Sequence, residues 1–342
     1  MHRISSVPGH PPQMEEAMKA LTLAAGVSCV AFAAIAETPV LTVLTYDSFT
    51  SEWGPGPAVE KAFEATCGCD LQFIASGDGA ALLARLQLEG AATQTDVVLG
   101  LDTSLTAAAA ATGLFAPHGQ PAATALPVPY DDPLFLPYDW GWFAFVYEKA
   151  RLPAPPTSFA ELAASDVKIV IQDPRSSTPG LGLLLWVKAA YGDKAADIWA
   201  GLADNIVTVT PGWSEAYGLF LAGEADMVLS YTTSPAYHRL AEKDDGKDWA
   251  PFIEGHYLQV EVSAKLAATD QPVLADAFLA FTQSAEFQAL IPETNWMYPA
   301  GDVPLPEGFE TARPVTSLLM TAQEAQAARG PALAEWQAAL AR

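Results

Sequence analysis

Aromatic side chains gather in the segments that follow predicted strands and helices. They are, in chain order, Tyr46, Trp53, Trp213, Tyr231, Tyr237 and Trp296. The same segments contain few His and Lys residues, which acid and base catalysis at neutral pH commonly uses. A ring that packs over a flat cation contributes about 0.5 to 2 kcal/mol of binding free energy. The pattern therefore predicts a site that binds a small, flat, positively charged solute, and it predicts no catalytic residues.

Asp78 and Gly79 begin a predicted helix after the second strand, at the sheet edge where ligands of open α/β proteins bind. Three or four rings with one carboxylate approach the roughly 12 kcal/mol of nanomolar binding, provided that the cleft closes around the ligand. Any single ring can instead belong to the core. We expect this of Trp186, Trp199 and Phe220, because they lie within predicted helices.

The segment from Arg175 to Gly180 is the best candidate for contacting an anionic part of the ligand. Pro179 suits the first position of a helix and Ser177 or Thr178 suits its N-cap, so free backbone N–H groups would point outward. The segment lacks the Gly-Lys-Ser/Thr ending of a nucleotide-binding P-loop. It is compatible with a hydroxyl or a single phosphate on the ligand, and ordinary helix capping explains the same residues equally well.

One segment resembles the nucleophile elbow of hydrolases. Gly212 to Ala216 lies on a predicted strand-to-helix turn, with Asp226 and then His238 or His256 downstream in hydrolase order. The final glycine of that motif is replaced by Ala216, and Ser214 is a good helix N-cap. We therefore favour the capping interpretation.

Cys67 and Cys69 form a Cys-Gly-Cys sequence at the end of a predicted helix. The two residues could form a small disulfide or remain thiols within a structural turn. No His or second Cys pair lies nearby at a spacing typical of zinc sites, so the sequence predicts no metal site and no cofactor.

The composition favours an exported binding protein. The chain has 342 residues, 51% of them hydrophobic, and 40 acidic against 17 basic residues give a formal net charge of -23. This charge disfavours nucleic acid and anionic membranes as partners and attracts cations. Residues 1–36 read as a signal peptide, because an apolar run ends in Ala34-Ile35-Ala36. Lipid attachment at Cys29 is the less favoured alternative.

Strands and helices alternate along the rest of the chain, which predicts an α/β fold with mostly parallel sheets covered by helices. The predicted strands are Val40 to Thr45, Asp70 to Ala75, Asp96 to Leu101, Phe143 to Tyr147, Lys168 to Gln172, Ile206 to Thr210, Met227 to Tyr231 and Tyr257 to Val262. The chain leaves its first lobe (37–140) for a second (141–257) and then returns (258–342). Strands at the crossing would form a hinge.

Several segments together resemble the periplasmic thiamine-binding proteins of bacterial ABC importers. They are TYDSF from Thr45, WGPGP from Trp53, DVVLGLD from Asp96, QDPRSSTPGLGLLLW from Gln172, GWSEAYGLFL from Gly212, VLSYTTSPAYH from Val228, EGHYLQVEV from Glu254 and NWMYP from Asn295. The resemblance implies a two-lobed type II periplasmic binding protein fold. It also implies a periplasmic, monomeric protein that captures thiamine or its phosphates and delivers them to an ABC permease in the inner membrane.

The family pattern also implies roles for individual residues. Tyr46, Asp78, Trp213, Tyr231, Tyr237 and Trp296 would surround the aminopyrimidine and thiazolium rings. Ser177 would face the hydroxyethyl or phosphate end. At the crossing strand, where the family has tyrosines, this chain has Trp140 and Trp142.

Two alternatives stay open. A thiamine-degrading enzyme of the same fold uses a cysteine in the cleft as nucleophile, and Cys67 and Cys69 are predicted to lie far from the cleft. A binding protein for another cation, such as a polyamine or ferric iron, is the second alternative. Iron favours clustered Tyr, His and carboxylate ligands, whereas Tyr231 and Tyr237 are separated by Ser234-Pro235.

Overall fold

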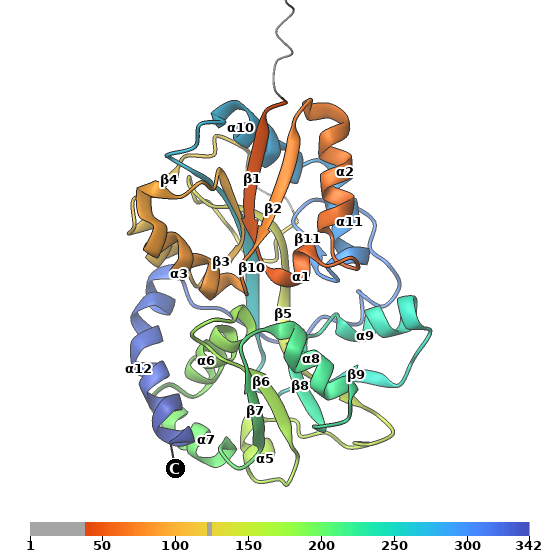
Figure 1. Ribbon diagram of the computed structural model, residues 1–342. Helices are drawn as coiled ribbons and strands as arrows, with labels where there is room; N and C mark the ends of the chain where they lie inside the picture. Colours follow the sequence, from red (N-terminus) through yellow and green to blue (C-terminus); the bar gives the residue numbers. More distant parts are fainter. Residues whose placement is uncertain (1–37, 122–124, 342) are drawn as a thin grey trace, which may run out of the picture. The chain divides into compact units, whose positions relative to one another are not determined.

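The computed structural model describes residues 38–121 and 125–341 (Figure 1). The predicted signal peptide at 1–36 and the alternative lipid attachment at Cys29 lie outside these residues. Within the described ranges, no helix combines the length and apolar character needed to cross a membrane.

The first lobe is built on three parallel strands whose helices cover the sheet. The strands are β1 (Val40–Thr45), β2 (Asp70–Ala75) and β3 (Val97–Asp102), with β1 in the middle. The helices are α1 (Asp47–Thr50), α2 (Gly56–Cys67), α3 (Gly79–Glu89) and α4 (Thr106–Ala110). Pro57 lies in the first turn of α2, and Gly68 ends that helix with a φ of 63°, a conformation that favours glycine. These strands match the predicted alternation closely.

Two long antiparallel strands run from the first lobe into the second. They are β5 (Leu136–Glu148) and β10 (His256–Leu266), and they pair with each other from Leu258↔Trp142 to Ser263↔Leu136. Only parts of both were predicted. The start of β5 was not predicted because it contains Pro137, and proline is rare within strands. Pro137 is tolerated here because it pairs with Val262 of β10, next to a bulge between Glu261 and Val262. Figure 1 shows both strands passing between the lobes.

The second lobe adds further strands beside β5, in the order β5-β8-β6-β7. They are β6 (Ile169–Gln172), β7 (Ile206–Thr210), β8 (Met227–Tyr231) and the short β9 (Lys247–Trp249). The helices are α5 (Phe159–Ala163), α6 (Thr178–Tyr191), α7 (Ala195–Leu202), α8 (Trp213–Leu221) and α9 (Ser234–Tyr237), and a π-helical turn follows at His238–Glu242. Trp186, Trp199 and Phe220 are buried within these helices, as expected from their positions in the sequence.

The C-terminal part of the chain divides between the lobes. Helices α10 (Pro272–Thr282) and α11 (Ala285–Thr294) pack in the first lobe, against β10 and α2. Helix α12 (Ala322–Leu340), which was not predicted, instead packs on α6 and α7 of the second lobe (Figure 1). It buries Trp336 and several alanines in the same core as Trp199. Part of the range 258–342 therefore contacts the second lobe, and the lobe boundaries stay a prediction.

Cys67 and Cys69 form a disulfide in the turn between α2 and β2, with their Cα atoms 5.2 Å apart. Of the two alternatives that the sequence left open, the structure has the bridged form. Cys69 is buried in the same apolar cluster as Val59 and Phe63 of α2.

Candidate functional site

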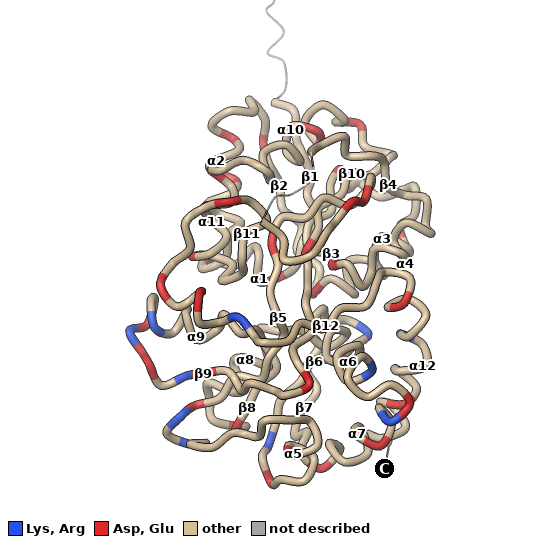
Figure 2. Tube along the Cα trace, turned by 180° about the vertical axis from the view of Figure 1, so that it is seen from behind, with Lys and Arg blue, Asp and Glu red and all other residues tan. Residues whose placement is uncertain are grey.

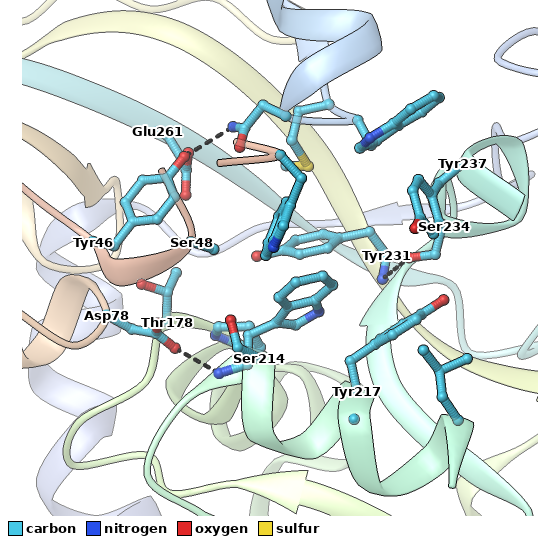
Figure 3. A pocket seen from close by; sticks show the side chains of 18 residues that line it. Tyr46, Ser48, Asp78, Thr178, Ser214, Tyr217, Tyr231, Ser234, Tyr237 and Glu261 are labelled. Atoms are coloured by element: carbon cyan, nitrogen blue, oxygen red, sulfur yellow. Dashed lines mark hydrogen bonds between the residues drawn. The ribbon is translucent and has the colours of Figure 1, made fainter. Parts of the chain in front are cut away.

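A cavity of about 290 Å³ lies where loops of both lobes meet the crossing strands (Figure 3). Its lining residues are Tyr46, Ser48, Trp53, Asp78, Thr178, Pro179, Trp213, Ser214, Tyr217, Gly218, Leu221, Tyr231, Ser234, Tyr237, Glu261, Asn295, Trp296 and Met297. All of the site residues predicted from the sequence are among them except Gly79 and Ser177. Those two lie immediately behind the lining.

The first lobe contributes rings from two separate loops. Tyr46 caps α1 directly after β1, and Trp53 follows that helix with 55% of its surface exposed. Trp296 follows α11 and has a φ of 56°, in the left-handed region that residues other than glycine rarely adopt. Trp296 and the next residue, Met297, both line the cavity. Such strain is kept only where surrounding contacts enforce it, and it is enriched at binding sites.

The second lobe contributes rings from α8, β8 and α9. Trp213 is the first residue of α8, and its indole Nε1 donates to Ser230 Oγ at 2.9 Å. Tyr217 lies one turn further along the same helix, with its ring centroid 5.0 Å from that of Trp213. Tyr231 ends β8, and Tyr237 ends α9. The loops at the carboxyl ends of the strands therefore present most of the aromatic surface.

Aromatic contacts connect the two lobes across the cavity. The ring centroids of Trp53 and Trp213 are 6.1 Å apart, and those of Tyr237 and Trp296 are 5.3 Å apart. In each pair one residue belongs to the first lobe and the other to the second. These ring contacts bring the two lobes together at the edge of the cavity.

His238 connects two of the lining tyrosines from behind. Its Nε2 is 2.8 Å from the Tyr217 hydroxyl, and its Nδ1 is 2.6 Å from Glu242 Oε2. The Tyr237 hydroxyl donates to the other oxygen of Glu242 at 2.9 Å. The hydroxyl groups of both tyrosines are thus connected through His238 and Glu242.

Asp78 lies at the N-termini of two helices of the second lobe. Its Oδ2 accepts from Ser177 Oγ at 2.6 Å and from Trp213 N at 3.2 Å, beside the first turns of α6 and α8. Burial raises the pKa of Asp78 to about 6, and the Ser177 and Trp213 hydrogen bonds oppose that rise. The anion-binding position predicted at Ser177 thus holds a carboxylate of the chain itself.

Gly79 supports the same contact between the lobes. Its N–H donates to Thr178 Oγ1 at 3.0 Å, and a Cβ at this position would lie 2.7 Å from the carbonyl oxygen of Gly100. Only glycine fits such a close approach. Gly79 and Ser177 therefore hold Asp78 and Thr178 in place, although neither lines the cavity.

Glu261 is the lining residue that the sequence analysis missed most clearly. It lies in the middle of β10, and its Oε2 accepts from Tyr138 OH at 2.7 Å and from Tyr46 OH at 3.1 Å. In Figure 3 its carboxyl group lies beside the Tyr46 ring. The available signal was an acidic residue within an otherwise largely apolar strand. Tyr217 could have been found from its spacing, four residues after Trp213 on one helix face.

Trp140 and Trp142, which stand where the family has tyrosines, do not line the cavity. Both indoles are buried, and the Trp140 ring stacks on Tyr298 with centroids 4.4 Å apart. Their Nε1 atoms donate to Pro299 O at 3.0 Å and Ser317 Oγ at 2.9 Å. These tryptophans act as core residues of the crossing strand.

The hydrolase-like motif does not assemble into a catalytic triad. Ser214 lines the cavity, but His238 is bonded to Tyr217 and Glu242, and His256 is bonded to Phe143 O and Phe252 N. Burial lowers the pKa of His256 to about 4. Neither histidine is placed to accept a proton from Ser214.

Within the described residues, one set of side chains has the spacing of metal ligands: His238, Glu242 and Asp244. Their atoms already have partners inside the chain. Asp244 Oδ2 lies 2.8 Å from Lys247 Nζ, and Glu242 accepts from Tyr237. A lysine in this position supplies the positive charge that a metal ion would bring.

Comparisons with known proteins agree with this architecture. The family described as bacterial extracellular solute-binding protein matches residues 55–289. The thiamine-binding periplasmic protein of Salmonella typhimurium is 56% identical over 309 residues, which cover 89% of this chain and 94% of that protein. The protein of the same name from Brucella abortus is 52% identical over 308 residues, covering 88% and 92%.

A solved structure of a periplasmic thiamin binding protein superposes with a TM-score of 0.87 at 55% identity, covering 89% of this chain and 97% of that one. These findings confirm the two-lobed periplasmic binding protein fold and the family predicted from the sequence. The chain therefore belongs to the bacterial extracellular solute-binding proteins, in the group of the periplasmic thiamine-binding proteins.

Proposed function

We propose that the protein binds thiamine in the cavity between its lobes, in the periplasm, and delivers it to an ABC permease. The observation that carries the proposal is the set of opposed rings, Trp53 with Trp213 and Tyr237 with Trp296, contributed by both lobes. All four residues line the cavity, and a flat cationic ring binds well over aromatic faces. The names of the relatives, at 52% and 56% identity, support the same ligand.

The charges around the cavity favour a cation. Two carboxyl groups, Asp78 and Glu261, line it, and the lining described above includes no Lys, Arg or His. Figure 2 shows Asp and Glu residues in both lobes, whereas Lys and Arg lie mainly in the second. The field at the cleft therefore attracts a positive ligand.

The hydroxyethyl or phosphate end of the ligand would lie near Thr178 and Ser214. These residues occupy the first turns of α6 and α8, where backbone N–H groups and the helix dipole favour negative charge. The carboxylate of Asp78 occupies part of this position, because it accepts a hydrogen bond from Trp213 N. Thiamine, its monophosphate and its diphosphate are thus all candidate ligands, and we propose that the protein binds them as a monomer without altering them.

Calorimetry with thiamine, its two phosphates and spermidine tests the proposal. We expect thiamine to bind with a dissociation constant near the nanomolar range, which corresponds to a binding free energy on the order of 12 kcal/mol. Spermidine should bind far more weakly. Preferential binding of spermidine would overturn the proposal. Prolonged incubation with thiamine, followed by assay for free thiazole, tests the thiaminase alternative; we expect no thiazole release.

A further inference from the structure

Three acidic residues lie side by side across the strands that join the lobes. Glu261 of β10 is paired with Asp102 of β3 on one side and with Asp139 of β5 on the other. Asp139 is fully buried and Glu261 is 6% exposed. Neither residue takes part in any ion pair of the described chain. Two buried carboxyl groups thus face each other without a cationic partner.

The groups that surround this pair are neutral hydrogen-bond donors. Glu261 accepts from Tyr138, from Tyr46 and from Gln259 Nε2, the last at 2.7 Å. Asp139 Oδ2 accepts from Asn295 Nδ2 at 2.6 Å, while its Oδ1 is buried without a hydrogen-bond partner. Such donors stabilise one negative charge but do not neutralise two, so the second carboxyl group must hold a proton.

Burial raises the pKa of Glu261 to about 7 and that of Asp139 well above its usual value. Repulsion between the two groups adds to the rise for Asp139. The other titratable groups around the pair are Tyr46, Tyr138, Tyr231 and Asp102. Burial raises the pKa of Asp102 to about 6, and the positive charge of Arg329 in α12 counteracts part of this rise. Burial keeps the three tyrosines neutral. Near pH 7 the carboxyl pair therefore shares a proton in the unliganded protein.

The carboxyl pair is also in direct contact with residues that line the cavity. Glu261 is part of the lining, and Asn295 Nδ2 bonds both Asp139 and the Tyr46 hydroxyl, the latter at 2.9 Å. The Tyr231 hydroxyl donates to Gln259, which in turn bonds Glu261. A positive ring held against Tyr46 and Tyr231 would lie next to this carboxyl pair and supply the missing positive charge.

We propose that Asp139 and Glu261 together are the counter-ion for the fixed positive charge of the ligand, and that the pair releases its proton when the ligand binds. The proton passes from the carboxyl pair to the solvent, and the bound cation replaces it. This inference rests on the proposed function, because it requires a cationic ligand in the cavity. Affinity for the ligand rises with pH until the unliganded pair is ionised.

Calorimetry of the wild-type protein with thiamine tests the inference without any substitution. Titrations at one pH in two buffers of different ionisation enthalpy count the protons released, and we expect on the order of one near pH 6.5. Between pH 5.5 and 7 the affinity should rise by up to about tenfold per pH unit. Tight binding with equal heats in both buffers and a flat pH profile would overturn the inference alone. Absence of thiamine binding at every pH would overturn the proposed function as well.

Variants locate the source of the proton. The isosteric double variant Asp139→Asn/Glu261→Gln should bind thiamine without proton release, and Asp102→Asn, a buried carboxyl outside the lining, should keep the release. Asp78 also titrates near pH 6. Proton release that persists in the double variant and disappears in Asp78→Asn would assign the proton to Asp78 and refute the proposal. Thermal unfolding of each variant establishes that it is folded.

Discussion

Asp78 and the carboxyl pair of Asp139 and Glu261 are all buried, but they are stabilised in different ways. Asp78 points from the first lobe into the N-termini of α6 and α8, whose dipoles and N–H groups favour its charged form. Asp139 and Glu261 lie on the crossing strands and have neutral donors only. The comparison separates two tasks: Asp78 holds the lobes together, whereas the pair on the crossing strands responds to the charge of the ligand.

Removal of the Asp78 side chain should have the largest effect on binding. Asp78→Ala leaves Ser177 Oγ and Trp213 N without their acceptor, and we expect a loss of about 3 kcal/mol, on the order of a hundredfold in affinity for thiamine. Calorimetry measures the effect, and the exposed Asp270→Ala is the matched control. Unchanged affinity in Asp78→Ala would remove its role in joining the lobes.

The carboxyl pair should instead dominate the pH dependence of stability. The pKa of Glu261 rises from 4.5 unfolded to about 7 folded, so the folded state binds more protons between these values and stability falls as pH increases. Glu261 alone should make the unliganded protein lose about 2 to 3 kcal/mol of unfolding free energy between pH 5 and pH 7.5. Urea unfolding at several pH values measures the total loss, to which the raised pKa values of Asp139, Asp78 and Asp102 also contribute, and Glu261→Gln should reduce it by about 2 to 3 kcal/mol. A wild-type slope in that variant would contradict the assignment.

The rings of Trp296 and Tyr237 should affect the affinity for the ligand without affecting the stability of the protein. Trp296→Ala and Tyr237→Ala each remove one ring of the pair that joins the lobes, and each should weaken thiamine binding by about 1 to 2 kcal/mol. Trp249→Ala, a tryptophan outside the lining, is the control for affinity. If both lining variants bind as tightly as the wild type, these rings do not belong to the site.

Neither cysteine of the disulfide lines the cavity, so removing the disulfide should have the smallest effect. Cys67→Ser/Cys69→Ser opens a very short loop, so we expect a loss of about 1 kcal/mol of stability and no change in affinity for thiamine. Chemical denaturation and calorimetry together test this. A large loss of affinity would indicate that the first lobe must be rigid at this turn.

The sequence predicted most of the fold because its strands are apolar runs bounded by turn residues. Val40–Thr45, Asp70–Ala75 and Met227–Tyr231 agree residue for residue with the structure. The long crossing strands were found only in part, because Pro137 and Gly141 interrupt the pattern of β5. Helix α12 was missed because Gly330 and Pro331 lie within it.

The candidate site could be located only where its residues lie in loops. Trp213 and Trp296 follow a strand and a helix, so the topology of an α/β sheet brings them to one edge. Glu261 lies within a strand, and its importance depends on the register that places it opposite Asp139. The predicted anion site at Ser177 was also incomplete, because nothing in the local sequence indicated that Asp78 of the other lobe would reach it.

The position of the indole rings gives the protein a built-in optical probe. Three of its nine tryptophans, Trp53, Trp213 and Trp296, line the cavity, and the first of them is 55% exposed. A ligand that enters will exclude water from these fluorophores and change their emission, whereas Trp186 and Trp199 remain buried in the second lobe. Uptake and release of the proposed ligand can therefore be followed in real time on the unlabelled protein.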